Sequence, residues 1–297
     1  MEETSTSRIR DFDRYRPLLF SIAYRMLGSV MDAEDIVQEA FVRWQGASEG
    51  EVRSPRAYLS AVVTRLSIDQ LRSARVRREE YVGPWLPEPL PEEPAPDVAD
   101  TAALNESLSM AFLVLLESLT PTERAVFLLR EVFDYDYGEI SHLVDKSEAN
   151  CRQIAHRARG YVAARRPRFE RSPEQEERLT GSFLEACMGG DMEGLLELLT
   201  EDIVLWSDGG GKARAALNPI RGSDKVARFL LGILGKTPPG LVVRQTRVNS
   251  QPGIIGYYAD GQPQSVTTFD IAEERIRAIH ILVNPEKLGN IPGLQEA

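Results

Sequence analysis

Cysteine, histidine and long apolar runs are all scarce in this chain of 297 residues. The two cysteines, Cys151 and Cys187, fall in separate predicted domains, so we expect two reduced thiols rather than a disulfide. The three histidines do not cluster with them at metal-ligand spacing, which predicts no metal site, and no cofactor is expected. No run of about 18 apolar residues occurs, which argues against a membrane-spanning helix. The polar, acidic N-terminus lacks the apolar core of a signal peptide, so we expect a cytoplasmic protein.

The net charge of −10 is unevenly distributed along the chain. Residues 81–120 hold seven Asp/Glu and no Lys/Arg, whereas Ser147–Arg171 holds seven arginines against two glutamates. The local field decides whether a surface attracts DNA, not the total charge. The acidic total therefore does not exclude DNA binding by the basic segments.

Three consecutive helices are predicted before residue 80. Apolar residues recur at helical spacing over Phe12–Leu27. Asp32 is a good N-cap for a second helix, whose inward-facing apolar residues leave a separate polar face. Ser54-Pro55 supplies a cap and an N1 proline for the third helix. The polar face of the second helix consists of Asp35, Gln38 and Glu39, and the third helix ends in Arg72, Arg75, Arg77 and Arg78.

A helix-turn-helix is predicted after residue 119. Thr120 to Glu123 form a capping box with proline at N1, which indicates a helix start. A short helix at Tyr137–Val144 and a tight turn at Asp145-Lys146 lead to a final helix capped by Ser147. Its exposed side carries residue types that bond base edges and phosphates, namely Asn150, Arg152, Gln153, His156, Arg157 and Arg159. A helix-turn-helix alone indicates any DNA-binding regulator.

The connection between these two helical parts is acidic and rich in proline, which forbids a helix and favours an extended chain. A plain spacer would not need an apolar cluster, so its first residues predict a docking segment. The members of this cluster are Tyr81, Pro84, Trp85, Leu86 and Pro87.

From Ser172 the composition changes, and two helices are followed by strand-like runs. The first run, Ile203–Trp206, precedes a helix at Ser223–Leu234, and four further strand candidates lie between Leu241 and Val283. Helices followed by a curled antiparallel sheet indicate an α+β domain. The glycine-rich stretch at Asp208–Lys212 lacks the spacing of a phosphate-binding loop, but it would let another chain segment approach the backbone closely.

Together these segments resemble a known family. The three N-terminal helices resemble region two, and Leu119–Arg165 resembles region four, of the sigma-70 family of RNA polymerase sigma factors, in its extracytoplasmic-function (ECF) class. The segment after Ser172 resembles the SnoaL-like cone-shaped folds, and a subgroup of the class carries such an appendage. The marks of this subgroup appear as Tyr81–Pro89, as Asp208, Gly209, Gly210, Gly211 and Lys212, and as Asn284, Pro285, Glu286, Lys287 and Leu288, with Glu286 where Asp is commoner.

The resemblance implies a multidomain fold with two all-α domains followed by an α+β SnoaL-like domain. The expected boundaries are 1–80 for region two, 81–104 for the linker, 105–171 for region four and 172–297 for the regulatory domain. Region two would bind the −10 element and, through its polar helix face, the β′ clamp of core RNA polymerase; the loop Gly46–Arg53 would accept a flipped base. Region four would read the −35 element of promoter DNA, with the β flap as a further polymerase contact.

The resemblance also implies regulation within the chain. We expect the glycine loop and Asn284–Leu288 to dock the Tyr81–Pro89 tether and the face of region two, which would orient the two DNA-binding domains. No separate anti-sigma factor and no membrane partner are expected. The simplest alternative for the polar helix face, a surface that is merely solvated, is less favoured because all three helices follow in the family's order.

Other function classes stay open on the residues. Catalysis would need a buried base and an oxyanion donor, for which the candidates Asp208, Tyr257, Tyr258, Asp270 and His280 show no diagnostic spacing, so no enzyme is expected. A ligand sensor is the stronger contender, with a pocket lined by Trp206, Phe229, Leu230 and Phe269. A helix-turn-helix regulator that works without polymerase, with a ligand-sensing C-terminal domain, is the main alternative to a sigma factor.

Overall fold

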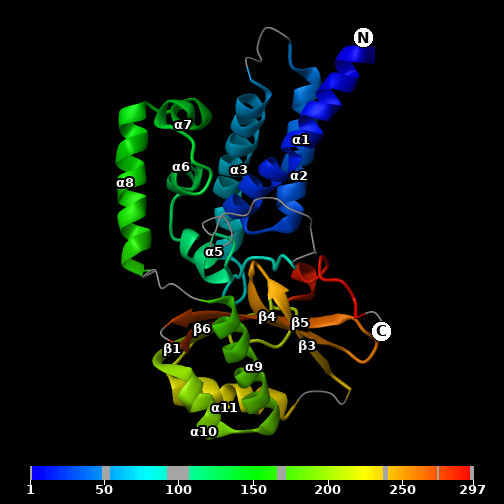
Figure 1. Cartoon of the computed structure of the whole chain (residues 1–297), viewed down its shortest axis with the longest axis vertical. Helices are drawn as coiled ribbons and strands as arrows, with labels where there is room; N and C mark the ends of the chain where they lie inside the picture. Colours follow the sequence, from blue (N-terminus) through cyan, green and yellow to red (C-terminus); the bar gives the residue numbers. More distant parts are fainter. Residues whose placement is uncertain are drawn as a thin grey trace. The chain divides into compact units, whose positions relative to one another are not determined.

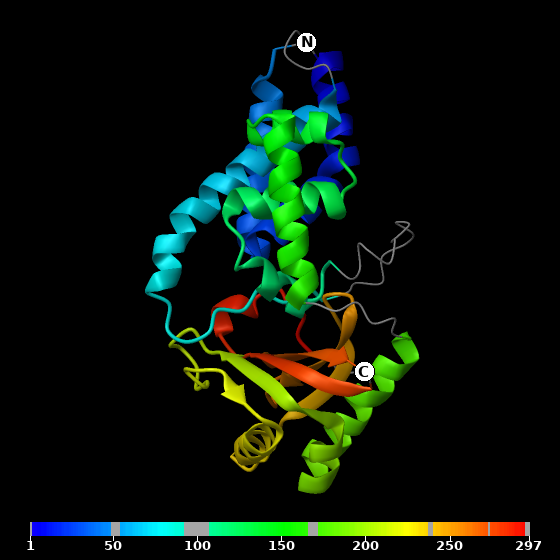
Figure 2. The ribbon, with the colours of Figure 1, turned by 90° about the vertical axis from the view of Figure 1, so that its left-hand side faces the viewer.

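The computed structural model describes residues 2–48, 54–91, 107–165, 172–236, 240–272 and 274–294. Side chains are described for all of these residues except 2–6 and 74–79. The chain forms two compact units (Figures 1 and 2). The N-terminal unit comprises Met1–Glu79 and Leu115–Pro167, and the C-terminal unit comprises Glu80–Val114 and Arg168–Ala297. No helix among the described residues is long and apolar enough to cross a membrane.

The regular elements described in the N-terminal unit are all helices. Its elements are α1 (Glu2–Leu27), α2 (Val30–Gly46), α3 (Pro55–Glu79), α6 (Pro121–Glu131), α7 (Tyr137–Val144) and α8 (Glu148–Arg165). The helix α5 (Met110–Leu116) precedes α6 and crosses the boundary between the units. α1 begins well before the predicted Phe12 because no glycine or proline interrupts the chain there. Arg8 in that extension donates to the carbonyl oxygens of Trp44, Gln45 and Ala47, where a cation stabilises the C-terminal end of α2.

The helix-turn-helix packs directly on the first three helices. The buried hydroxyls of Ser60 in α3 and Tyr135 before α7 lie 2.7 Å apart. Arg65 of α3 donates to the carbonyl oxygens of His142 and Leu143 at the end of α7. The fully buried Arg124 of α6 donates to the carbonyl oxygen of Met26 at 2.6 Å. Desolvation lowers the pKa of Arg124 to about 9.

The C-terminal unit is an α+β domain with a six-stranded sheet. Its helices are α9 (Pro173–Gly189), α10 (Met192–Leu198), α11 (Ser223–Leu234) and the short η1 (Pro285–Lys287). Its strands are β1 (Leu199–Asp208), β2 (Ile220–Arg221), β3 (Val242–Val248), β4 (Gln251–Tyr257), β5 (Pro263–Ala272) and β6 (Arg275–Leu282). They lie in the order β2-β1-β6-β5-β4-β3.

The sheet is mixed, which corrects the expectation of a purely antiparallel one. β1 and β6 run parallel, while β3 to β6 form consecutive antiparallel pairs. Short connections allow only antiparallel neighbours, but β1 and β6 are separated by most of the domain, so a parallel pair is possible. The two-residue strand β2 was not predicted, because so short a segment carries no periodic signal.

Each face of this sheet buries its own apolar cluster. One face packs against α9, α10 and α11 (Figure 1). The apolar cluster between them includes Phe183 of α9, Val226 and Leu230 of α11, and Phe269 of β5. The opposite face is covered by Leu86 from the linker and by Leu288 and Ile291 from the chain end. Residues of one strand alternate between the two faces. Two distinct sites can therefore be built on neighbouring residues of the same strand.

Candidate functional site

The predicted polar face of α2 is solvent-exposed. Asp35, Gln38 and Glu39 are all exposed, whereas Ile36 and Val37 between them are buried. Glu39 forms an exposed ion pair with Arg43 one turn along the helix, and such a pair adds little stability. The three residues therefore form a continuous polar surface that no packing within this unit requires.

Only part of the predicted basic end of α3 is described. Arg72 is exposed and pairs with Asp69 at 3.2 Å. Arg75, Arg77 and Arg78 belong to α3, but their side chains lie outside the described residues. Most of the loop predicted to accept a flipped base, residues 49–53, also lies outside them.

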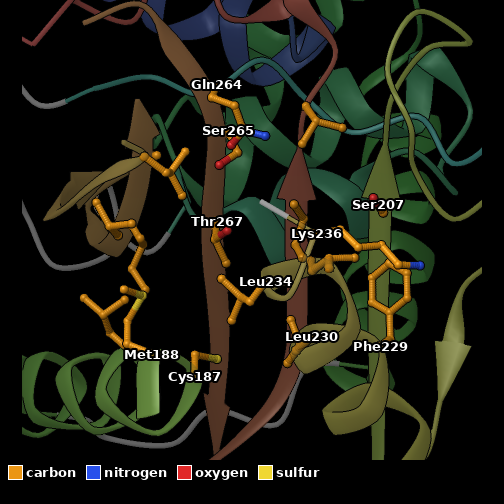
Figure 3. Close-up of a pocket in the computed structure, with 18 of the residues that line it drawn as sticks. Cys187, Met188, Ser207, Phe229, Leu230, Leu234, Lys236, Gln264, Ser265 and Thr267 are labelled. Carbon is orange, nitrogen blue, oxygen red and sulfur yellow. The ribbon is translucent and has the colours of Figure 1, made fainter. Parts of the chain in front are cut away.

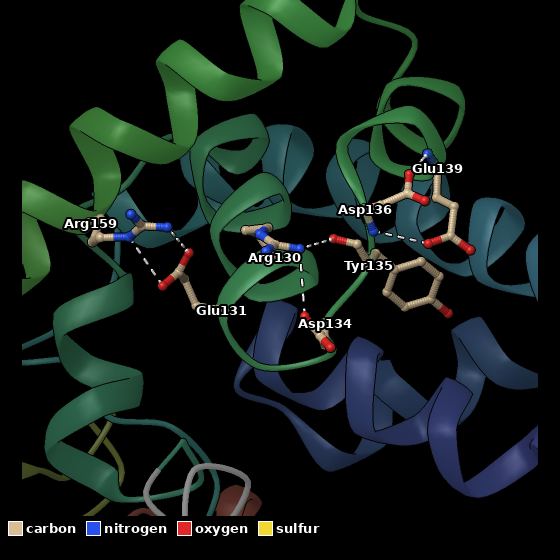
Figure 4. Close-up of polar contacts among 7 residues, drawn as sticks. All are labelled: Arg130, Glu131, Asp134, Tyr135, Asp136, Glu139 and Arg159. Carbon is tan, nitrogen blue, oxygen red and sulfur yellow. Dashed lines mark hydrogen bonds and ion pairs between the residues drawn. The ribbon is translucent and has the colours of Figure 1, made fainter.

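Local hydrogen bonds define each helix of the helix-turn-helix. Thr120 and Glu123 form the predicted capping box at the start of α6. Asp136 and Glu139 form a second one at the start of α7, which was not predicted (Figure 4). Asp145 then takes a left-handed conformation with φ 53°, which ends α7 and turns the chain toward α8.

α8 presents the six predicted DNA-contacting side chains to solvent. Asn150, Arg152, Gln153, His156, Arg157 and Arg159 are all exposed. The opposite side of the helix is buried through Cys151, Ile154, Ala155 and Ala158. The position of Cys151 is therefore a core position. An exposed, basic helix face of this kind fits the major groove of B-DNA.

Three of these arginines already contact carboxylates. Arg159 donates to both oxygens of Glu131 at 2.6 and 3.2 Å, and this hydrogen bond raises its pKa (Figure 4). Arg152 pairs with Glu148 at 2.8 Å, and Arg157 lies 3.8 Å from Glu123. All three arginines are at least half exposed, so these pairs add little stability.

A buried ion pair forms the centre of the C-terminal unit's linker site. Asp208 at the end of β1 has a side chain with no exposed surface, and Lys287 of η1 is 2.8 Å from its Oδ2. Asp208 Oδ2 also accepts from the backbone N–H of Leu86 at 2.8 Å, while Lys287 Nζ donates to the carbonyl oxygen of Leu86 at 2.6 Å. A buried charge pair is tolerated when such further hydrogen bonds satisfy it. The pair thus binds the linker backbone at Leu86 from both sides.

Aromatic residues of the linker surround this pair. The hydroxyl of Tyr81 donates to Asp208 Oδ1 at 2.6 Å and accepts from Asn284 Nδ2 at 2.9 Å. Burial and the bond to Asp208 raise the pKa of Tyr81. Lys287 Nζ lies 4.9 Å from the centre of the Tyr81 ring and 4.2 Å from that of Trp85, which are cation–π distances. We name this group of five residues, Tyr81, Trp85, Asp208, Asn284 and Lys287, the linker latch.

The glycine loop makes room for the linker. A Cβ on Gly210 would collide with Asn284 Nδ2 and would lie 2.9 Å from the Tyr81 hydroxyl. A Cβ on Gly211 would lie 3.3 Å from Cβ of Val82. Both glycines also have positive φ, at 56° and 73°, which other residues adopt only with strain. Both reasons favour glycine at Gly210, whereas at Gly211 the left-handed φ is the main reason.

Further contacts extend the linker site, and several were not predicted. Leu90 exchanges backbone and side-chain hydrogen bonds with Asn249, Pro91 forms a β-bridge with Val248, and Asn290 donates to the carbonyl oxygen of Pro89. No sequence pattern marks these asparagines as partners of a segment far away in the chain. The remaining predicted residues lie around these contacts. Gly209 and Pro87 are buried, and Pro84 is partly buried. Pro285 begins η1, Leu288 is buried in the same apolar cluster as Leu86, and Lys212 forms an ion pair with Glu286.

The opposite face of the sheet holds a cavity of about 340 Å³ beneath α9 and α11 (Figure 3). Phe229 and Leu230 line it as predicted, but Trp206 and Phe269 do not. Trp206 points to the other face of β1, where it stacks on His280, and Phe269 packs edge-on against Phe183 in the core.

The candidate catalytic residues lie away from this cavity. Among the described residues, its lining includes none of Asp208, Tyr257, Tyr258, Asp270 and His280, and no other carboxylate or histidine. His280 is buried with its Nδ1 unpaired, and desolvation lowers its pKa to about 4. Asp270 pairs with Arg277. No group of three His, Cys, Asp or Glu in the described ranges is arranged to hold a metal, and both cysteines are free and buried.

Comparisons with known proteins agree with this architecture. The family model described as Sigma-70 region 2 matches residues 12–77, and the one described as Sigma-70, region 4 matches residues 109–161. The ECF RNA polymerase sigma factor SigJ of Mycobacterium tuberculosis is 36% identical over 96% of this chain and 94% of its own. The probable ECF RNA polymerase sigma factor SigI of the same species is 33% identical over 92% of each.

A solved structure extends the likeness to three dimensions. The crystal structure of the M. tuberculosis extracytoplasmic function sigma factor SigJ matches with a TM-score of 0.77 and 33% identity, over 96% of this chain and all of that one. Both helical regions and the α+β domain are therefore shared with a relative of nearly equal extent. The chain belongs to the sigma-70 family of RNA polymerase sigma factors, in the ECF subgroup that carries a C-terminal SnoaL-like domain.

Proposed function

We propose that the C-terminal unit regulates this sigma factor in cis by holding the linker between regions two and four. Membership of the family implies that the chain binds core RNA polymerase and promoter DNA. We assign the polymerase contact to Asp35, Gln38 and Glu39, the −10 contact to the basic end of α3, and the −35 contact to α8. The observation that carries the regulatory part is the linker latch, in which two buried charges bind the linker backbone at Leu86.

The packing of the N-terminal unit supports a need for opening. The positions −10 and −35 differ by about 25 base pairs, which corresponds to about 85 Å along B-DNA. In this unit α7 contacts α3 directly, through Arg65 and through the Ser60–Tyr135 hydrogen bond. Region four must therefore leave α3 before one chain can read both elements.

The length of the linker supports a role for its docking. Residues 92–106 span at most about 50 Å when fully extended, which is short of the promoter distance. Residues 80–91 add twelve further positions, and 27 residues reach about 95 Å. While residues 81–91 are docked, their span and direction are fixed by the C-terminal unit. Release of the latch would make the full reach available.

The latch also explains why the chain end and the body of the domain should act differently. Lys287 neutralises Asp208, while Leu288 and Ile291 cover the sheet face on which the linker docks. Loss of residues 284–297 would leave a buried carboxylate unpaired and an apolar face open, which is costly. Loss of the whole domain removes the restraint without leaving such a surface. This division of roles makes a separate anti-sigma factor unnecessary.

Transcription by core polymerase from a genomic promoter library tests the proposal. We expect residues 1–171 to be more active than the full chain. Residues 1–283 lose Asn284 and Lys287 of the latch but also expose the apolar sheet face that Leu288 and Ile291 cover, and we expect this damaged form to be less active than the full chain. Equal activity of all three would contradict cis regulation, and failure of every form to bind core polymerase would contradict the polymerase contact. Tight DNA binding without polymerase would instead favour the stand-alone regulator.

A single-atom change gives a milder version of the same test. Tyr81→Phe removes the hydroxyl bonded to Asp208 and Asn284 but keeps the ring beside Lys287. We expect higher promoter activity from Tyr81→Phe, with unchanged affinity for core polymerase. Tyr258→Phe is the matched control, because Tyr258 is 46% exposed in the same unit and is not part of the latch.

A further inference from the structure

The cavity under α9 and α11 has an apolar interior and a cationic edge. Phe229 and Leu230 contribute apolar walls and Lys236 lies at the edge (Figure 3). Phe183, Ile254 and Ile281 add further apolar walls, and Arg214 is the second charged residue among the described lining. None of the described residues that line the cavity is negatively charged. This is unexpected from composition, because residues 172–297 hold 17 Asp/Glu against 12 Lys/Arg. The charge at the cavity is thus opposite to that of its domain.

The two cations at the cavity have no ion-pair partner among the described residues. Arg214 and Lys236 are exposed and form no ion pair with any described residue. Ser207 of β1 is only 4% exposed and lines the cavity, and its hydroxyl is not among the buried polar atoms that lack a partner. The hydroxyl is therefore open to the cavity and can donate a hydrogen bond to the oxygens of a ligand head group.

We propose that this cavity binds one small amphipathic monocarboxylate, with its apolar body against Phe229 and Leu230 and its carboxylate toward Ser207, Arg214 and Lys236. A cavity of about 340 Å³ lies at the lower end of the range of small-molecule sites, about 300–1,000 Å³. Unbranched carboxylates of about eight to ten carbons are therefore suitable probes. The described lining holds no carboxylate or histidine that could act as a general base, which favours binding over turnover.

The same two strands connect this cavity to the linker latch. On β1, Ser207 faces the cavity and the next residue, Asp208, belongs to the latch. After β6, Val283 lines the cavity and the next residue, Asn284, bonds to Tyr81. Occupancy of the cavity can therefore bias the latch through adjacent backbone positions. This coupling rests on the proposed regulatory function, whereas binding itself does not.

Isothermal titration of the full-length protein with straight-chain carboxylates tests the binding. We expect affinity to rise about fourfold for each methylene from hexanoate to octanoate, as burial of each group predicts, and to level off beyond decanoate. Decanol should bind more weakly than decanoate. An affinity that keeps rising past dodecanoate, or equal binding of decanol and decanoate, would contradict a cavity of this size with a cationic edge.

Substitutions locate the site. Lys236→Met and Arg214→Met should each weaken decanoate binding about three- to fivefold and leave decanol binding unchanged. Lys225→Met, on the exposed side of α11, is the control with the same charge change. Thr267→Phe should fill the cavity and abolish both ligands' binding (Figure 3). Unchanged decanoate binding by Thr267→Phe, with the fold retained by circular dichroism, would overturn the assignment.

The two proposals can fail independently. No carboxylate binding would overturn the cavity assignment while leaving the truncation results for cis regulation intact. Binding that does not alter transcription would retain the site and contradict only its coupling to the latch.

Discussion

At the scale of single residues, the Asp208–Lys287 pair is the most strongly constrained feature of the C-terminal unit. Their side chains are 0% and 9% exposed, and both also bond to the linker backbone. Removal of one partner leaves a buried charge, at a cost of about 3–5 kcal/mol, whereas removal of both can be nearly neutral. Under the proposed regulation the pair would contribute specificity for the docked linker more than stability.

A double-mutant cycle tests this. Lys287→Met should lower the free energy of unfolding by about 3 kcal/mol, and Asp208→Asn with Lys287→Met should cost less than the two single changes added together. Urea unfolding of the full-length variants measures both. Additive losses would show that the two side chains do not interact in the folded protein.

His280 gives a pH dependence whose sign follows from its burial. Its pKa is lowered to about 4 because desolvation disfavours the cation, whereas an unfolded histidine has a pKa of about 6.5. The unfolded chain binds more protons between these values, so the stabilising effect is complete above about pH 6.5 and is lost as pH falls toward 4. Between pH 7.5 and 5 the loss is about 2 kcal/mol.

The matched variant His280→Gln isolates this effect. Urea unfolding at pH 7.5 and at pH 5 should show a larger loss of stability for the natural chain than for His280→Gln, by about 2 kcal/mol. The same loss in both proteins would mean that His280 is protonated in the folded state or accessible to water.

At the scale of elements, local signals and long-range pairings differ in what the sequence reveals. The capping box at Thr120 and the short helix Tyr137–Val144 could be predicted because their hydrogen bonds join residues three or four positions apart. The parallel pairing of β1 with β6 could not, because no local pattern encodes it. The same limit applies to the sides of β1: without the pairing, the sequence predicts that Trp206 lines the cavity, whereas Ser207 does so.

The motifs of the linker site were only partly predictable from the sequence. The resemblance groups Tyr81–Pro89 with the two C-terminal motifs, and the structure places residues of all three in contact. The buried pair that joins them spans 79 residues and could not be derived from either motif alone. Asn249 and Asn290 were missed because each is a single polar residue in an ordinary turn or chain end.

α8 allows a prediction about DNA at the same scale. Arg152→Ala and Arg157→Ala should weaken binding of the full-length protein with core polymerase to a −35 duplex, and each lost phosphate contact should reduce the salt slope by about 1. Arg228→Ala, an exposed arginine on α11, is the control. Titration of fluorescent duplex at several salt concentrations gives both values. An unchanged slope for both α8 variants would place the DNA-contacting surface elsewhere.

At the scale of the whole molecule, two restraints on the DNA-binding regions lie in different units. Region four packs on region two in one unit, and the linker between them is fixed by buried charges in the other. Under the proposed regulation both restraints would oppose separation of the two regions. The latch residues lie outside the surfaces that we propose to bind DNA, so the latch would be a suitable place for control.

A reversible covalent lock at the latch tests this central claim most directly. A Cβ on Gly211 would be 3.3 Å from Cβ of Val82, slightly below the usual spacing in a disulfide, so Val82→Cys with Gly211→Cys should form one on oxidation. The strain of a side chain at the left-handed Gly211 is the same before and after reduction, so it does not affect the comparison. Transcription by core polymerase with this variant is measured before and after reduction, with each single variant as control. We expect the oxidised form to be at least about fivefold less active than the same sample after reduction. Equal activity of the two forms, with the disulfide verified by mass, would contradict regulation through linker docking.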